Sequence, residues 1–163
     1  MINVAGIYHN DLVNGPNLRT VLFVQGCPHH CKGCHNAHTW EFGAGDSLTS
    51  DHLVKLLTEN PLDKGITISG GEPICQWEEL YPVIQQLKDK KYHLMLYTGY
   101  TRTWLNNKIK TDDLFLDFLS LFDMVVTGPY IQQQKVKYEE HLIYGSYNQE
   151  ICKIDNGKLI KIN

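Results

Sequence analysis

Residues Leu18–Cys34, with the sequence LRTVLFVQGCPHHCKGC, carry the two features that decide the fold. The first part, Leu18–Gln25, is rich in β-branched and apolar residues, which is typical of a buried strand. A glycine ends this run, and Cys27, Cys31 and Cys34 follow with the spacing C-x3-C-x2-C. The sequence therefore predicts a strand whose carboxyl end leads into a loop with three cysteines, which we call the cysteine loop.

The crowding of these cysteines indicates a metal centre. The chain has five cysteines, an odd number, and thiolates this close together suit a soft metal or an iron-sulfur cluster better than a disulfide framework. Two alternatives are open. One is a 4Fe-4S cluster with three cysteine ligands and an open position on its fourth iron. The other is a structural zinc site, which needs a fourth ligand that a nearby histidine would supply; the candidates are His29, His30, His35 and His38.

Strands and helices alternate after the cysteine loop, which favours a mostly parallel sheet with helical crossovers. The residue patterns predict helices over 50–60 (capped by Ser50 or Asp51), 77–91 and within 112–122, and strands over 65–69, 93–97 and 124–127. The segments EICKID and KLIKI, separated by Asn156-Gly157, predict a terminal hairpin. No repeat or linker divides the chain, so we expect one domain over residues 1–163.

Chemically useful motifs follow each predicted parallel strand, at the end where such sheets bind ligands. After the cysteine loop these are GGEP (Gly70–Pro73), TGY (Thr98–Tyr100) and TGPY (Thr127–Tyr130). The two glycines of GGEP let a ligand approach the backbone, and Glu72 offers a carboxylate to a cationic ammonium group. Without the cysteine motif, a plain strand-to-helix turn explains GGEP equally well.

Composition narrows the classes of partner. Fifteen Lys and Arg against eighteen Asp and Glu give a net charge of −3, which argues against a nucleic-acid partner. No apolar run is long enough for a membrane helix, and the first residues lack a secretory pattern, so we expect a cytoplasmic protein with no membrane partner.

Arg19 and Arg102 are expected at the surface, and Cys75 and Cys152 in the core. We assign no role to His9, His52, His93 and His141.

The combination of C-x3-C-x2-C after the first strand and GGEP after the second resembles the radical S-adenosylmethionine enzymes. Within that superfamily, CHNAHTW (Cys34–Trp40) is similar to the glycyl-radical activating enzymes. NGPNLR, YTGY and GSYNQ together resemble the activators of the anaerobic ribonucleoside-triphosphate reductase. The resemblance extends from Asn14 to about Gln149.

This resemblance implies an oxidoreductase with a 4Fe-4S cluster on Cys27, Cys31 and Cys34. S-adenosylmethionine bound at the open iron is cleaved by one electron, and the 5'-deoxyadenosyl radical generates a glycyl radical on the large catalytic subunit of the reductase. The implied electron source is a low-potential donor such as a flavodoxin. The residues implied to contact S-adenosylmethionine are Gly33, Cys34, His35, Asn36, Gly70, Gly71, Glu72, Thr98 and Gly99.

Two other functions stay open. One is activation of another glycyl-radical enzyme such as pyruvate formate-lyase, and the other is a non-enzymatic, zinc-binding interaction module. For the fold, a full barrel of the radical S-adenosylmethionine type has six strand-helix units, whereas this chain has length for about four or five. We therefore expect a short, open, partial (β/α) barrel with a lateral opening for a protein substrate.

Overall fold

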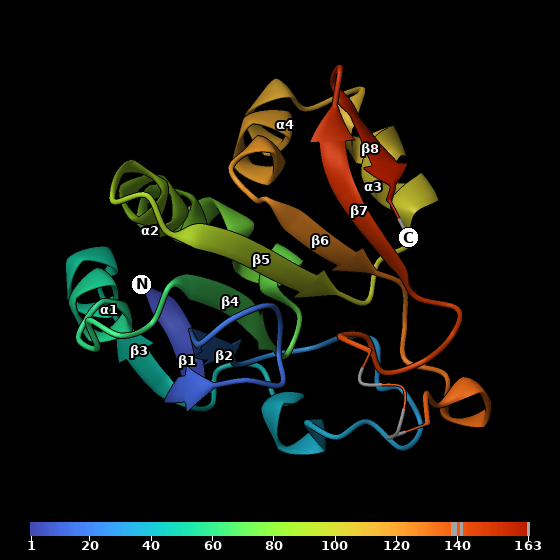
Figure 1. Ribbon diagram of the computed structural model, residues 1–163, viewed down its shortest axis with the longest axis horizontal. Helices are drawn as coiled ribbons and strands as arrows, with labels where there is room; N and C mark the ends of the chain where they lie inside the picture. Colours follow the sequence, from blue (N-terminus) through green and yellow to red (C-terminus); the bar gives the residue numbers. More distant parts are fainter. Residues whose placement is uncertain (138–139, 141, 163) are drawn as a thin grey trace.

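The protein is built on one eight-stranded sheet with the strand order β3-β1-β2-β4-β5-β6-β7-β8 (Figure 1). The computed structural model describes residues 1–137, 140 and 142–162. The strands are β1 Ile2–Asp11, β2 Arg19–Val24, β3 Asp46–Leu48, β4 Gly65–Gly70, β5 His93–Thr98, β6 Met124–Thr127, β7 Glu150–Asp155 and β8 Lys158–Lys161. The helices are α1 Ser50–Leu57, α2 Trp77–Asp89, α3 Arg102–Ile109 and α4 Asp113–Ser120, with 3-10 turns at Ala37–Thr39, Pro73–Gln76 and Gln132–Gln134.

The centre of the sheet is parallel, as the alternation of strands and helices predicts. Strand β2 pairs with β4 from Arg19↔Gly65 to Val24↔Gly70, and β5 and β6 continue the parallel order. This register brings the carboxyl ends of β2, β4, β5 and β6 to one edge of the sheet. The cysteine loop, GGEP, TGY and TGPY leave the sheet at that edge and therefore lie side by side.

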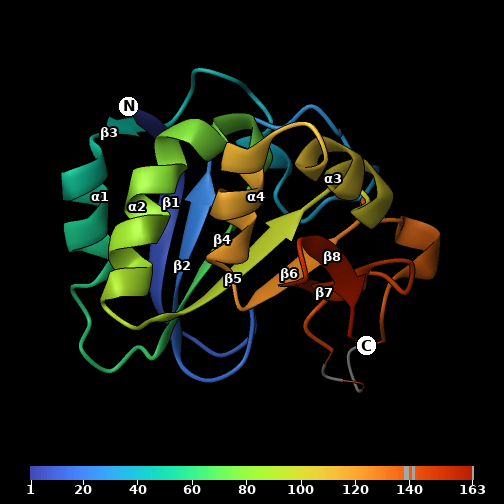
Figure 2. The same cartoon turned by 90° about the horizontal axis from the view of Figure 1, so that it is seen from above.

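The four helices cover one face of the sheet (Figure 2). Helices α1, α2 and α4 each present an apolar stripe to the strands, such as Leu80, Val83, Ile84 and Leu87 of α2, all fully buried. Helix α1 is capped by Thr49, whose hydroxyl accepts a hydrogen bond from the amide of His52. The expected cap at Ser50 or Asp51 is wrong, because Ser50 is already the first helical residue.

Antiparallel strands flank the parallel centre on both sides. Strands β1 and β3 add to one edge, and the predicted hairpin is confirmed as β7 and β8 at the other. The two outer strands, β3 and β8, are not paired with each other, so the sheet stays open as expected. The sequence patterns did not predict β1, β3 and α3, since β1 is interrupted by register shifts and α3 buries only Leu105 and Ile109.

Arg19 is fully buried, contrary to the surface position expected for it. Its guanidinium donates hydrogen bonds to the Thr67 hydroxyl at 2.7 Å and to the carbonyl of Pro16 at 2.6 Å. Thr67 in turn donates to the carbonyl of Asn14 at 2.8 Å. Arg19 thus fixes the loop between β1 and β2 to the sheet.

Among the described residues, no helix is long and apolar enough to cross a lipid bilayer. His141, to which no role was assigned, lies outside the described residues.

Candidate active site

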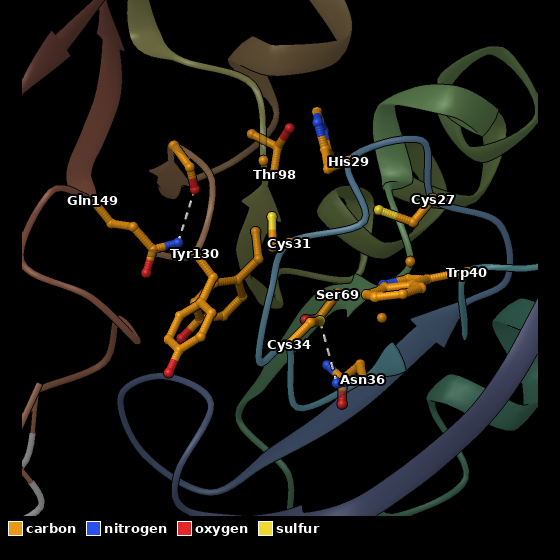
Figure 3. A pocket seen from close by; sticks show the side chains of 15 residues that line it. Cys27, His29, Cys31, Cys34, Asn36, Trp40, Ser69, Thr98, Tyr130 and Gln149 are labelled. Carbon is orange, nitrogen blue, oxygen red and sulfur yellow. Dashed lines mark hydrogen bonds between the residues drawn. The ribbon is translucent and has the colours of Figure 1, made fainter. Parts of the chain in front are cut away.

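A pocket lies at the carboxyl edge of the parallel strands, where the motifs meet (Figure 3). Its walls come from the cysteine loop and from the ends of β4, β5 and β6. The lining residues are Cys27, His29, Cys31, Cys34, Asn36, Trp40, Ser69, Gly70, Gly71, Tyr97, Thr98, Gly99, Gly128, Tyr130 and Gln149. The structure therefore brings the three clustered cysteines to the same cavity as GGEP and TGY.

The cysteine loop is held by its own backbone. The amides of Gly26 and Cys27 donate to the carbonyls of Thr39 (2.7 Å) and Trp40 (3.0 Å), which closes the loop at its base. Inside it, the amide of Cys34 donates to the carbonyl of Cys31 at 3.0 Å. The thiols of the loop are free, and burial raises the pKa of Cys27 and Cys31. Without a bound metal these two thiols therefore hold their protons, and binding a metal would release them.

Three glycines let the walls of the pocket approach one another. Gly70 has a φ of +101°, which favours glycine. A side chain on Gly71 would collide with the backbone of Gly26, and one on Gly99 with the ring of His29. The glycine at position 71 is therefore required by the cysteine loop that packs on it, a reason that the sequence did not indicate.

Glu72 is fully buried and connects three segments of the site. Its Oε1 accepts hydrogen bonds from the Thr98 hydroxyl at 2.8 Å and from the amide of Ile74 at 3.0 Å. Its Oε2 accepts from the amide of Gly99 at 2.8 Å and lies 2.7 Å from Nε2 of His29. In this arrangement the carboxylate joins GGEP, TGY and the cysteine loop, and it does not line the pocket surface.

Of the other predicted contact residues, Asn36 and His35 line pockets and Gly33 does not. Asn36 lines the main pocket, and its backbone N–H donates to Sγ of Cys34 at 3.4 Å. His35 is exposed beside Tyr130 and lines a second pocket, which also contains Cys34 and Asn36. Gly33 is exposed, packs against the side chain of Gln132 and lines neither pocket.

The two isolated cysteines differ in their surroundings. Cys152 is fully buried on β7, as expected. The expectation for Cys75 is wrong, since it is exposed on the 3-10 turn that follows GGEP. Although the residue as a whole is exposed, its thiol is partly shielded from water, and this desolvation, followed by the charge of Glu72, raises the pKa of Cys75 to about 11, so the thiol stays protonated at neutral pH.

Sequence reasoning did not assign several lining residues to the site. Gly128 and Tyr130 lie within TGPY, a motif whose residues were given no individual role, and Ser69 directly precedes GGEP, so extending that motif by one position would have found it. Gln149 lies in GSYNQ and donates to the carbonyl of Gly128 at 2.9 Å, which is drawn in Figure 3. His29 was considered only as a zinc ligand, and no sequence signal pointed to its contact with Glu72.

Comparisons with known proteins agree with this geometry. Residues 13–152 match the family model described as a 4Fe-4S single cluster domain. The chain is also 32% identical over 161 residues to the anaerobic ribonucleoside-triphosphate reductase-activating protein of Haemophilus influenzae, covering 92% of this chain and 97% of that protein. The chain belongs to this family of activating proteins. It is therefore an enzyme of the radical S-adenosylmethionine type, with a 4Fe-4S cluster and S-adenosylmethionine as cofactors.

A second relative broadens the family, and a solved structure supports the fold. The pyruvate formate-lyase-activating enzyme of Clostridium pasteurianum is 40% identical over 122 residues, which are 71% of this chain and 51% of that protein. The crystal structure of QueE from Escherichia coli is similar to this structure, with a TM-score of 0.51 and 20% sequence identity. The similarity covers 61% of this chain and 53% of QueE. The likeness to QueE supports the open sheet of a short, partial barrel. The Clostridium pasteurianum relative is a second activating enzyme, of which this chain spans about half the length.

The sequence left two kinds of metal centre open, and the match to a 4Fe-4S domain favours the iron-sulfur cluster over the zinc site. The donor set fits this group, because three unpaired thiols of one loop face one cavity. Among the described residues, no three Cys, His, Asp or Glu side chains are placed to hold a single metal ion.

Proposed function

We propose that this protein generates the glycyl radical of the anaerobic ribonucleoside-triphosphate reductase, acting on the large catalytic subunit. The observation that carries the proposal is the pocket in which Cys27, Cys31 and Cys34 face the glycine-lined ends of β4 and β5. The three cysteines would hold the 4Fe-4S cluster, which would bind S-adenosylmethionine in this pocket. When bound, the two cofactors supply a 5'-deoxyadenosyl radical after transfer of one electron from a low-potential donor such as a flavodoxin.

The residues of the chain orient the cofactor and keep water away from it. The backbone at Gly70, Gly71 and Gly99 offers a surface without side chains on which the methionine and adenosyl parts can lie. Thr98 and Asn36 present polar groups at opposite walls, and Tyr130 covers the side towards the second pocket. A closed, dry site protects a reactive radical from side reactions.

The protein substrate reaches this site through the second pocket. That pocket shares Cys34, Asn36 and Tyr130 with the first and opens between the loop at Val13–Asn14 and residues 142–145. The hydroxyl of Tyr97 donates to the carbonyl of Ile143 and so ties this outer wall to β5. Leu12 and Val13 are 72% and 76% exposed, which suits a surface that a large folded partner covers.

The test is the formation of 5'-deoxyadenosine by the reduced, cluster-loaded protein with and without the reductase. We expect slow, uncoupled cleavage by the protein alone and faster cleavage coupled to radical transfer when the reductase is present. Because the Clostridium pasteurianum relative is 40% identical, pyruvate formate-lyase is the second candidate substrate and belongs in a parallel reaction. Coupled cleavage with formate-lyase and not with the reductase would replace the first candidate by the second.

A further inference from the structure

His29 connects the cysteine loop to the buried carboxylate of Glu72. It lies between Cys27 and Cys31 in the sequence, and its Nε2 is 2.7 Å from Oε2 of Glu72. The side chain of His29 is 19% exposed and lines the pocket, whereas that of Glu72 is 0% exposed. Since the carboxylate already accepts three other hydrogen bonds, it acts as the acceptor and Nε2–H of His29 donates.

The imidazole ring is held in place from both sides. The backbone of Gly99 lies against one side, so close that a side chain there would collide with the ring. Tyr100 packs edge-on against it, with the ring centroids 4.7 Å apart, and Tyr100 stacks in turn on Trp104 at 3.9 Å. The ring therefore has a fixed position, as expected of a side chain that holds two loops in a defined relative position.

The four donors to Glu72 come from two sides of the pocket. The amides of Ile74 and Gly99 and the hydroxyl of Thr98 belong to the loops after β4 and β5. His29 belongs to the cysteine loop. Removing its donor leaves Oε2 with the single hydrogen bond from Gly99 and breaks the side-chain link from Glu72 to the cysteine loop.

We propose that His29 is a positioning residue, which through Glu72 fixes the cysteine loop relative to the two loops that hold S-adenosylmethionine. This inference rests on the proposed function. A ligand that spans the open iron and the ends of β4 and β5 binds well only when both sides are held in the correct relative position. His29 supplies that alignment without touching the reacting atoms.

The test uses His29→Gln and His29→Asn in the full chain, loaded with the cluster. The glutamine amide nitrogen takes the place of Nε2 and can still donate to Glu72, whereas the asparagine amide is one carbon shorter and cannot. Both variants thus carry an amide side chain, and they differ only in its length. Three quantities are measured anaerobically: iron and sulfide content, the S-adenosylmethionine dissociation constant by calorimetry, and the change in the electron paramagnetic resonance (EPR) spectrum of the reduced cluster when S-adenosylmethionine is added.

We expect full iron in both variants. Asparagine should weaken S-adenosylmethionine binding roughly tenfold, the size of a lost hydrogen bond to a charged group, and should reduce the EPR change. Glutamine should restore both properties to nearly the level of the native chain. Equal affinity for S-adenosylmethionine in both variants and the native chain would overturn the inference. Tighter binding in the asparagine variant would overturn it too, because His29 would then compete with S-adenosylmethionine for the Glu72 carboxylate. Iron loss in both variants would also overturn it. A native chain that binds no S-adenosylmethionine would instead refute the proposed function.

Discussion

Replacing Arg19 with Met tests whether a buried guanidinium supports the loop beside the active site. The side chain is fully buried, and its two shortest hydrogen bonds go to neutral oxygens, the hydroxyl of Thr67 and the carbonyl of Pro16. A hydrogen bond to a charged group contributes about 1.5 to 3 kcal/mol, so the two together contribute about 3 to 6 kcal/mol. Methionine fills a similar volume and removes the cost of burying a charge, which offsets part of this loss. The net decrease in the free energy of unfolding should be about 2 to 4 kcal/mol.

The assay is urea unfolding of the metal-free protein, followed by far-ultraviolet circular dichroism. Arg102→Met is the matched control, because Arg102 forms a partly exposed pair with Glu150 at 2.8 Å and should contribute less than about 1 kcal/mol. A decrease below about 1 kcal/mol for Arg19→Met, or one equal to that of Arg102→Met, would show that the buried guanidinium does not stabilise the loop.

Three further predictions concern the cluster, the packing of the pocket and the pH dependence of stability. Cys31→Ala should abolish the cluster in iron and sulfide assays, whereas Cys152→Ala should keep it; a full cluster in Cys31→Ala would contradict the ligand assignment. Gly71→Ala should displace the cysteine loop and lower the iron content. Gly6→Ala is the control and should keep the iron, because its new methyl group meets only the exposed ring of Tyr8. Equal iron content in the two variants would count against the packing of Gly71 on the cysteine loop. The Arg102 guanidinium holds the pKa of Glu150 below its usual value, so this pair stabilises the protein above the ordinary glutamate pKa and the effect is lost as pH falls through the folded pKa. Glu150→Gln should therefore lower stability by up to about 1 kcal/mol at pH 7 and converge with the native chain in acid, and a difference that persists at low pH would exclude this cause.

The central part of the fold follows from short-range patterns in the sequence. The strand at Arg19–Val24 and the helix at Trp77–Asp89 have clear apolar runs or spacing, and their predicted limits agree with the structure within a residue or two. Strand β1 escaped prediction because its pairing with β2 shifts register twice, which disturbs the alternation of apolar and polar residues.

The site was predictable as a group of motifs but not in its internal contacts. Parallel strands bring their carboxyl ends together, so the meeting of the cysteine loop with GGEP and TGY could be foreseen. The link from His29 to Glu72 joins residues 43 positions apart, and no local pattern encodes such a contact. The burial of Arg19 was missed for the same reason, since its partners Thr67 and His93 lie on later strands.

The most direct test of the account is an EPR measurement on the reductase itself. The reduced, cluster-loaded protein is mixed anaerobically with S-adenosylmethionine and the large subunit of the anaerobic ribonucleoside-triphosphate reductase. We predict a glycine-centred radical signal on the reductase that is absent when Cys31→Ala replaces the native chain. Formation of 5'-deoxyadenosine at equal rates with and without the reductase, and no glycyl signal in the mixture, would contradict the assignment of the reductase as substrate.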